Sequence, residues 1–256
     1  MVVAYDGTTF EGFQRQGGRV TVQGELETHL TRLSGHPVQV TAAGRTDTGV
    51  HASGQVIHFD TWGSVPPGGY EFALNERLSG AIRVRCSEET DQAFHARFSA
   101  ISRSYRYWLC SKASQPFRGR WCWQCNRLER VKWDLVRSAA AGLVGRNDFA
   151  AFSRGQSGAR STVRTLRLIS VVQVGSLTRL DMTADAFLRG MVRGLVGALV
   201  EVGSGRLSPE KLSEWLAEGR RESGLAWAPA RGLFLASVEY PDGYGAGGDL
   251  EEDWTP

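Results

Sequence analysis

The sequence predicts an α+β fold of two α/β subdomains, each with a mainly antiparallel sheet and helices on one face. Strand-like and helix-like segments alternate along the chain without strict βαβ order. Two strand-like runs, Val163–Val174 and Leu177–Thr183, are separated by Gly175-Ser176, which is typical of a β-hairpin. The segment Leu188–Val202 has apolar residues at the i, i+3, i+4, i+7 spacing of a helix.

The predicted boundaries give an N-terminal subdomain over residues 1–98 and a C-terminal subdomain over residues 99–241. Residues 242–256 are acidic and Gly-rich, and we expect this tail to be disordered. In the first subdomain the patterns predict strands at Val2–Tyr5, Val38–Ala42, Gln55–Asp60 and Ile82–Ser87, and helices at Val22–Leu33 and Glu71–Leu78.

The second subdomain begins with a predicted strand, Ser99–Cys110, in which Tyr105 and Tyr107 share one face because strand side chains alternate. Tyrosines interleaved with arginines suit base stacking and phosphate contact, although core tyrosines beside surface arginines give the same pattern. The remaining predictions are helices at Val131–Val144, at Leu188–Val202 and from Ser208-Pro209 onward, and a closing strand at Leu233–Val238.

The most informative loop is Gly44-Arg-Thr-Asp-Thr-Gly-Val-His51, which joins two predicted strands. Gly44 and Gly49 allow sharp turns on either side of Asp47, so this loop can hold one carboxylate in a fixed direction. A lone Asp between glycines can also simply cap a turn. His51 and His58 are too few nearby ligands for a metal, so we expect no metal here.

The charge distribution points weakly to nucleic acid. Five of the 27 Asp and Glu lie in the tail, residues 242–256, which leaves 30 Lys and Arg against 22 acids in the rest of the chain, and only Lys112, Lys132 and Lys211 among the bases are lysines. Arginine suits bidentate phosphate contacts and stacking on bases, but a GC-rich genome also favours its codons. On the predicted helix Leu188–Val202, Arg189 and Arg193 are four residues apart and should lie side by side, where they could meet phosphate or carboxylate or form a solvated edge.

The cysteines and the N-terminus suggest a cytoplasmic protein. Cys122 and Cys125 form one Cys-x-x-Cys without a second pair at zinc spacing, so we expect Cys86, Cys110, Cys122 and Cys125 to be reduced, incidental thiols. No targeting signal or long apolar run is visible.

Taken together, the motifs closely resemble the tRNA pseudouridine synthase A family, in order, from residue 2 to about residue 241. The matching motifs are Tyr5-Asp-Gly-Thr, Gly12-Phe-Gln-Arg-Gln16, Thr21-Val-Gln-Gly-Glu25, Ala43-Gly-Arg-Thr-Asp-Thr-Gly-Val-His51, Gly54-Gln-Val-Ile-His-Phe59, Phe94-His-Ala-Arg-Phe-Ser-Ala100, Tyr105-Arg-Tyr107, Asp148-Phe-Ala-Ala-Phe152, Phe187-Leu-Arg-Gly-Met-Val-Arg193 and Gly232-Leu-Phe-Leu235. One departure is Thr48, where alanine is common in the family.

The resemblance implies a homodimer without metal or cofactor that converts uridine to pseudouridine at positions 38, 39 and 40 of the tRNA anticodon stem-loop. It implies that Asp47 is the nucleophile, that Arg193 pairs with it, that Tyr105 stacks on the target base and that Arg45 helps to hold the RNA. The implied fold has an RNA-binding cleft between the two subdomains. We further expect Arg160, Arg164 and Arg189 to bind the tRNA backbone through phosphates.

Two other functions fit single features. Asp47-Thr-Gly49 matches the active-site triplet of aspartic proteases, but those enzymes need two triplets in an all-β fold. A non-catalytic RNA-binding module would use Tyr105 and Tyr107 for stacking, with Asp47 as a turn cap. Release of label from C5-tritiated uridine separates an enzyme from such a binder.

Overall fold

A computed structural model describes residues 1–111, 116–155, 161–221, 227–242 and 244. The described residues divide into two compact units, one formed by Met1–Ser102 and the C-terminal residues that begin at Phe234, the other by Arg103–Leu233. The last strand is therefore part of the first unit, although it comes from the C-terminal end of the sequence. The predicted subdomain bounds, residues 1–98 and 99–241, stay a prediction.

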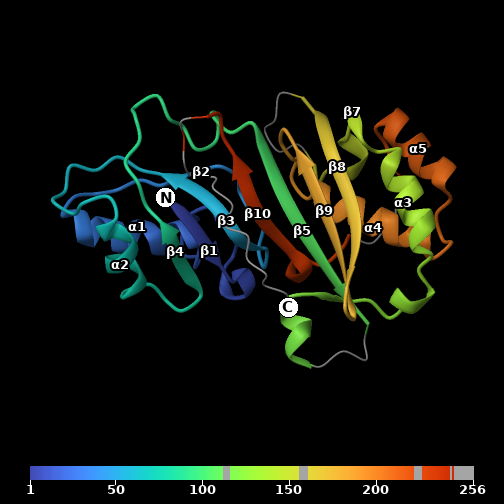
Figure 1. Cartoon of the computed structure of the whole chain (residues 1–256), viewed down its shortest axis with the longest axis horizontal. Helices are drawn as coiled ribbons and strands as arrows, with labels where there is room; N and C mark the ends of the chain where they lie inside the picture. Colours follow the sequence, from blue (N-terminus) through green and yellow to red (C-terminus); the bar gives the residue numbers. More distant parts are fainter. Residues whose placement is uncertain (112–115, 156–160, 222–226, 243, 245–256) are drawn as a thin grey trace. The chain divides into compact units, whose positions relative to one another are not determined.

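The first unit contains a mainly antiparallel sheet (Figure 1). In this sheet β3 (His51–His58) pairs with β1 (Val2–Tyr5) and β2 (Thr41–Ala42) antiparallel and with β10 (Leu233–Glu239) parallel. The edge strand β4 (Ile82–Cys86) pairs antiparallel with β1. The strand order is β4-β1-β3-β10, so β1 and β3 are central.

Two helices complete the first unit, α1 (Val22–Ser34) and α2 (Gly69–Asn75). The Thr21 side chain accepts a hydrogen bond from the backbone N–H of Gly24 and caps α1, and Gly35 ends it with a φ of 72°. Leu26 and Leu30 lie one turn apart and are fully buried, so this face of α1 joins the core. The predicted helix at Val22–Leu33 is confirmed.

The second unit has the antiparallel strand order β5-β9-β8-β7, formed by β5 (Ser102–Cys110), β9 (Leu177–Ala184), β8 (Val163–Val174) and β7 (Gly145–Asp148). A short strand, β6 (Trp123–Gln124), pairs parallel with β5. The predicted β8–β9 hairpin is confirmed, with Gly175 at a φ of 58° in its turn.

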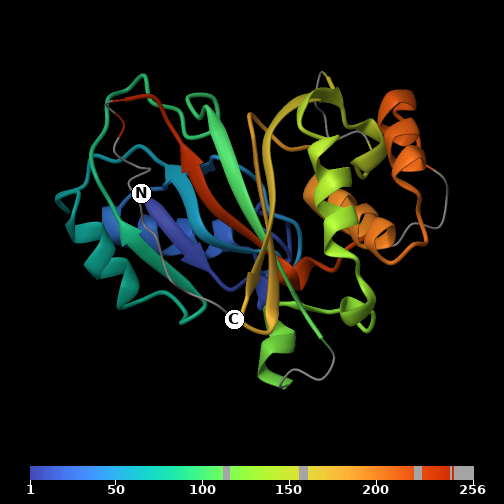
Figure 2. The same ribbon diagram turned by 45° about the vertical axis from the view of Figure 1, so that its right-hand side comes forward.

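Helices α3 (Trp133–Ala141), α4 (Met191–Gly203) and α5 (Pro209–Glu218) lie on the same side of this hairpin (Figure 2). Helix α4 is buried along most of its length and packs against α3. The Ser208 side chain accepts a hydrogen bond from the N–H of Lys211 and caps α5, as its Ser-Pro start predicts. The predicted α+β class, with mainly antiparallel strands and helices on one face, is confirmed.

Several predicted bounds differ from the structure. The strand predicted at Val38–Ala42 is limited to Thr41–Ala42, and β3 begins at His51, four residues before its predicted start. Helix α4 begins at Met191 because Gly190 has a φ of 72°, which a right-handed helix does not allow. Arg189 therefore precedes the helix, and its predicted place within the helix Leu188–Val202 is wrong.

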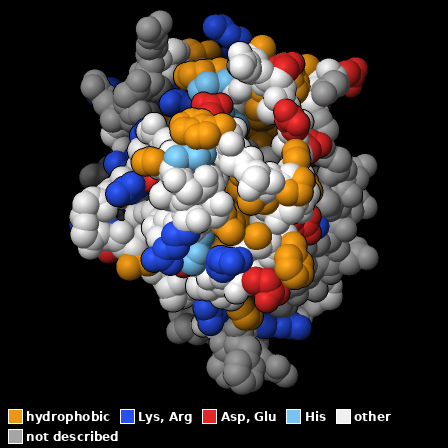
Figure 3. Space-filling view, turned by 90° about the vertical axis from the view of Figure 1, so that its left-hand side faces the viewer, with side chains coloured by type: hydrophobic (Ala, Val, Ile, Leu, Met, Phe, Trp, Pro, Cys, Tyr) orange, Lys and Arg blue, Asp and Glu red, His pale blue; other side chains and the backbone are white. Residues whose placement is uncertain are grey.

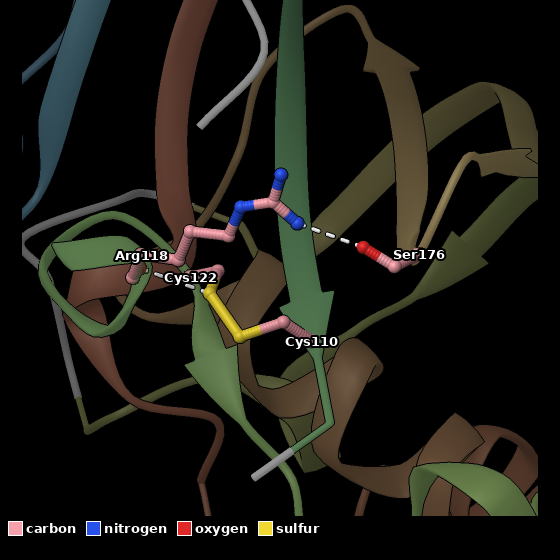
Figure 4. Close-up of a disulfide and its surroundings, with 4 residues drawn as sticks. All are labelled: Cys110, Arg118, Cys122 and Ser176. Carbon is pink, nitrogen blue, oxygen red and sulfur yellow. Dashed lines mark hydrogen bonds between the residues drawn. A yellow bond between two sulfur atoms is a disulfide. The ribbon is translucent and has the colours of Figure 1, made fainter. Parts of the chain in front are cut away.

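The expectation of four reduced thiols is also wrong, because Cys110 and Cys122 form a disulfide (Figure 4). Parallel pairing of the end of β5 with β6 brings the two residues together, with a Cα–Cα distance of 6.1 Å that suits a disulfide. Arg118 donates a hydrogen bond to the Ser176 hydroxyl (2.7 Å) beside it. Cys86 and Cys125 are free thiols.

Within the described ranges, no helix is long and apolar enough to cross a bilayer.

Candidate functional site

The Asp47 loop, residues 43–50, connects β2 to β3 in the first unit. Gly49 has a φ of 74°, and the N–H of Val50 donates to the carbonyl of Asp47 (3.1 Å), which closes a tight turn immediately after Asp47. Asp47 is half-buried, whereas Arg45, two residues earlier, is exposed. The loop thus holds one carboxylate at the edge of the core and one arginine in solvent.

A buried tyrosine anchors this loop from the neighbouring strand. The hydroxyl of Tyr5, on β1, lies 2.8 Å from the Thr46 hydroxyl. Gln55, on β3, donates to the carbonyl of Gly44 (2.7 Å) and to the Tyr5 hydroxyl (3.4 Å). Tyr5, Thr46 and Gln55 are all buried, so these bonds fix the loop inside a low-dielectric core.

Burial also strengthens the preference of Tyr5 for its protonated form. It raises the pKa of Tyr5 to about 12, against the opposing effect of the hydrogen bonds with Thr46 and Gln55. The hydroxyl is therefore neutral over the physiological pH range and retains its proton for hydrogen bonding.

The loop is also held by close backbone approach. The N–H of Phe13 donates to the carbonyl of Thr46 (3.0 Å). Gly12 has a φ of 93°, and a Cβ there would lie 2.9 Å from that same carbonyl. A Cβ on Gly7 would lie 2.0 Å from the carbonyl of Val50. Both positions therefore require glycine, because any side chain would push the Asp47 loop away.

His51 anchors the C-terminal end of the loop. Its imidazole is fully buried, stacks on Phe234 (4.5 Å between ring centroids) and accepts a hydrogen bond at Nδ1 from the N–H of Gly7 (3.0 Å). The same Nδ1 lies 3.2 Å from Oδ1 of Asp6, so the ring contacts two consecutive residues that follow β1. Strand β3 therefore begins at a fixed position directly after the Asp47 loop.

Tyr105 lies on β5 in the second unit and is 8% exposed. Its ring meets Phe187 edge to face, with 4.9 Å between ring centroids. Tyr107, two residues on, is fully buried and donates its hydroxyl to the carbonyl of Pro229 (2.8 Å). Burial raises the pKa of Tyr107 well above its usual value. Tyr107 is therefore a core residue, and of the two tyrosines only Tyr105 has exposed surface.

Arg193 lies in the first turn of α4 and is half-buried. Its Nε donates to the carbonyl of Ala228 (2.7 Å), and the N–H of Ala228 donates to the carbonyl of Arg193 (3.1 Å). These two bonds tie the guanidinium and the helix start to one segment, which limits the directions that the other guanidinium nitrogens can take.

The three arginines expected to bind the tRNA backbone differ in their surroundings. Arg189 is exposed just before α4. Arg164 is half-buried on β8, and its Nη1 donates to the carbonyls of Ser161 (3.0 Å) and Val163 (2.6 Å). Arg160 lies outside the described residues.

The first unit therefore contains Asp47 and Arg45, and the second contains Tyr105, Arg193, Arg189 and Arg164. Their assigned roles stay predictions. The sequence did not identify Tyr5, Thr46 and Gln55 as the anchors of the loop. Tyr5 and Gln55 do lie within two of the matching motifs, Tyr5-Asp-Gly and Gly54-Gln. No pattern in the sequence predicts, however, that these side chains contact the Asp47 loop.

A fixed, half-buried carboxylate can act as a nucleophile or stabilise positive charge that develops on a substrate. In the ranges that the structure describes, no three or more His, Cys, Asp or Glu side chains are grouped so as to hold a metal ion. Over the face of the first unit at the left of Figure 1, Arg side chains are scattered among hydrophobic, acidic and His side chains (Figure 3).

Comparison with known proteins shows extensive similarity. A family model described as tRNA pseudouridine synthase matches residues 1–99 and 139–241. A protein of Brevibacillus brevis called tRNA pseudouridine synthase A is 42% identical over 244 residues, which cover 93% of this chain and 98% of the relative. Proteins of the same name from Chlorobium luteolum and Neisseria meningitidis serogroup B are 43% and 41% identical, over 95% and 96% of this chain and 95% and 92% of the relatives.

Among solved structures, a Cbf5-Nop10-Gar1 complex matches 79% of this chain and 44% of that chain, with a TM-score of 0.35 and 9% identity. That likeness is too distant to support a conclusion about function.

Proposed function

Because the chain belongs to the tRNA pseudouridine synthase family, we propose that it isomerises uridine to pseudouridine in tRNA. The observation that carries this proposal is the 42% identity to a tRNA pseudouridine synthase A over 93% of the chain. The Asp47 loop supports it, since Tyr5, Gln55 and two obligatory glycines hold the carboxylate-bearing turn in one conformation.

The reaction breaks the glycosidic bond between C1′ and N1, turns the uracil and joins C1′ to C5. The proton on C5 is then released and N1 gains a proton, so the product is an isomer of the substrate. We assign Asp47 as the nucleophile, which adds to the base or to the sugar. Stabilisation of charge at C1′ by the same carboxylate is the third possibility.

The target uridine is stacked in an RNA stem-loop, and flipping it out costs a few kcal/mol. We assign Tyr105 as the stacking partner of the flipped base, because stacking on an aromatic ring returns about 1–3 kcal/mol. The edge-to-face contact between the Tyr105 and Phe187 rings restricts the orientation of the Tyr105 ring. Arg193 is proposed as the ion-pair partner of Asp47 and Arg45 as a contact to the RNA around the displaced nucleotide.

The finer parts of the proposal concern the substrate position and the assembly. We propose positions 38, 39 and 40 of the anticodon stem-loop as targets, a homodimer as the assembly, and the cytoplasm as the location, since tRNA is modified there. The cytoplasm is a reducing environment. We therefore expect that reduction of the Cys110–Cys122 disulfide leaves the activity unchanged.

The test is release of tritium from tRNA that carries C5-tritiated uridine. We expect label to appear in water at a rate proportional to enzyme, with loss of uridine and gain of pseudouridine at positions 38–40. A non-catalytic RNA-binding module would bind the same tRNA and release no label, so binding without release would overturn the proposal.

A further inference from the structure

A cluster of cations surrounds one tryptophan in the second unit. The guanidinium of Arg154 lies 4.8 Å from the ring centroid of Trp227, and that of Arg221 lies 4.1 Å from the same centroid. The two charges are therefore separated by no more than the sum of these distances. Cation–π attraction to one ring holds them there, although like charges repel.

The cluster packs against the start of α4. A Cβ on Gly190 would lie 3.1 Å from both the Trp227 ring and the Arg154 side chain, and a Cβ on Gly194 would lie 2.8 Å from the ring. The two glycines thus leave room for the indole against the helix. The N–H of Arg154 donates to the carbonyl of Arg189 (2.8 Å), which joins a third arginine to the cluster through the backbone.

Arg154 and Arg221 have no ion-pair partner among the acids that the structure describes. Among the described ion pairs none includes Arg154 or Arg221, whereas the neighbouring Arg220 pairs with Glu218. Within the same ranges, Nη1 of Arg221 is buried and has no hydrogen-bond partner. Burial, and next the charge of Arg154, lower the pKa of Arg221, because each disfavours a charged guanidinium.

A bound anion would relieve this repulsion and satisfy the buried donor. The positive end of the α4 dipole adds to the attraction, since Met191 begins the helix and Gly190 provides no side-chain cap. Ala228, which accepts the Arg193 bond, directly follows Trp227, so the cluster lies one residue from the segment that positions Arg193.

We propose that Arg154 and Arg221, held on Trp227, form a phosphate-binding site that takes a backbone phosphate of the RNA substrate. The inference rests on the proposed function for the identity of the ligand, whereas the anion chemistry follows from the cluster itself. Trp227 acts as the support that places both guanidinium groups, and the site adds one neutralised phosphate to those expected from Arg189 and Arg164.

The first test uses tRNA. Arg154→Gln and Arg221→Gln should each lower the slope of log affinity against log salt by about 0.7–0.9, the value expected when one phosphate fewer is neutralised by the protein. Each should weaken tRNA binding more than it slows single turnover at saturating tRNA. The matched control is Arg137→Gln, because Arg137 is already paired with Asp134 (2.9 Å) and should leave the slope unchanged. Wild-type slopes in both cluster variants would overturn the inference.

The second test uses inorganic phosphate and does not depend on tRNA. The indole N–H signal of Trp227, identified in the wild-type NMR spectrum by its loss in Trp227→Phe, should shift on titration with phosphate at constant ionic strength. The shift should disappear in the Arg154→Gln/Arg221→Gln variant, and an unmoved signal in wild type would refute the anion site. A chain that shows the phosphate shift and the steep salt slope but releases no tritium would retain this site and lose the proposed enzymatic function.

Discussion

Removal of one buried hydroxyl should separate the stability of the Asp47 loop from the reactivity of its carboxylate. Tyr5→Phe keeps the ring, which is 4% exposed, but deletes the hydroxyl that lies 2.8 Å from the Thr46 hydroxyl. Gln55 keeps its bond to the carbonyl of Gly44 (2.7 Å), so Thr46 is the group that loses its partner. One unsatisfied buried polar group costs about 1–3 kcal/mol, which sets the expected loss in the free energy of unfolding.

The same change should slow the chemical step. If the displacement of Asp47 raises the activation free energy by about 1.4 kcal/mol, the single-turnover rate falls about tenfold. The double variant Tyr5→Phe/Thr46→Val removes both hydroxyls and should regain part of the stability, because replacing both partners is nearly neutral.

Denaturant unfolding and single-turnover tritium release measure the two effects. Tyr70→Phe is the matched control, since Tyr70 is 3% exposed and its hydroxyl lies 3.1 Å from Thr61, away from the Asp47 loop. This control should lose stability and keep its rate. The positioning role of Tyr5 is refuted if Tyr5→Phe loses stability as expected but turns over at the wild-type rate.

The remaining predictions concern the second unit. Tyr105→Phe should keep the stacking face and bind RNA nearly normally, whereas Tyr105→Ala should turn over far more slowly; equal single-turnover rates for wild type and Tyr105→Ala would make it an ordinary core residue. Arg189→Ala should weaken binding to all tRNA substrates alike and lower the salt slope by about one unit, and Arg164→Ala should do the same to a smaller extent, because its Nη1 already donates to two carbonyls. Arg193→Ala should damage the chemical step and leave the salt slope nearly unchanged; a normal rate with a reduced slope would make Arg193 a backbone clamp instead.

Local patterns predicted most of the secondary structure because each pattern depends on residues close in sequence. Val22–Leu33 has a cap, a helical apolar stripe and a following glycine, and α1 forms there. The β8–β9 hairpin forms at the predicted place because its turn, Gly175-Ser176, lies between two strand-like runs that are adjacent in sequence. The observed start of α4 differs from the prediction because the apolar periodicity includes Leu188, whereas Gly190 has a left-handed conformation that glycine allows and that periodicity does not reveal.

The features that the sequence did not predict depend on contacts between distant segments. Cys110 and Cys122 meet because β6 pairs with β5, and β6 has only two residues and no alternating pattern. Tyr5 reaches Thr46 across 41 positions of sequence. The cluster around Trp227 joins residues from three separate segments, so no local motif reveals it.

The most direct test of the central claim is Asp47→Asn, assayed in parallel for tritium release from C5-tritiated tRNA and for tRNA affinity. The amide keeps the size of the side chain but cannot act as a nucleophile, and the basic surface is unchanged. We expect no turnover and an affinity within severalfold of wild type. More than a trace of pseudouridine in the product formed by Asp47→Asn would contradict the assignment of Asp47 as the nucleophile.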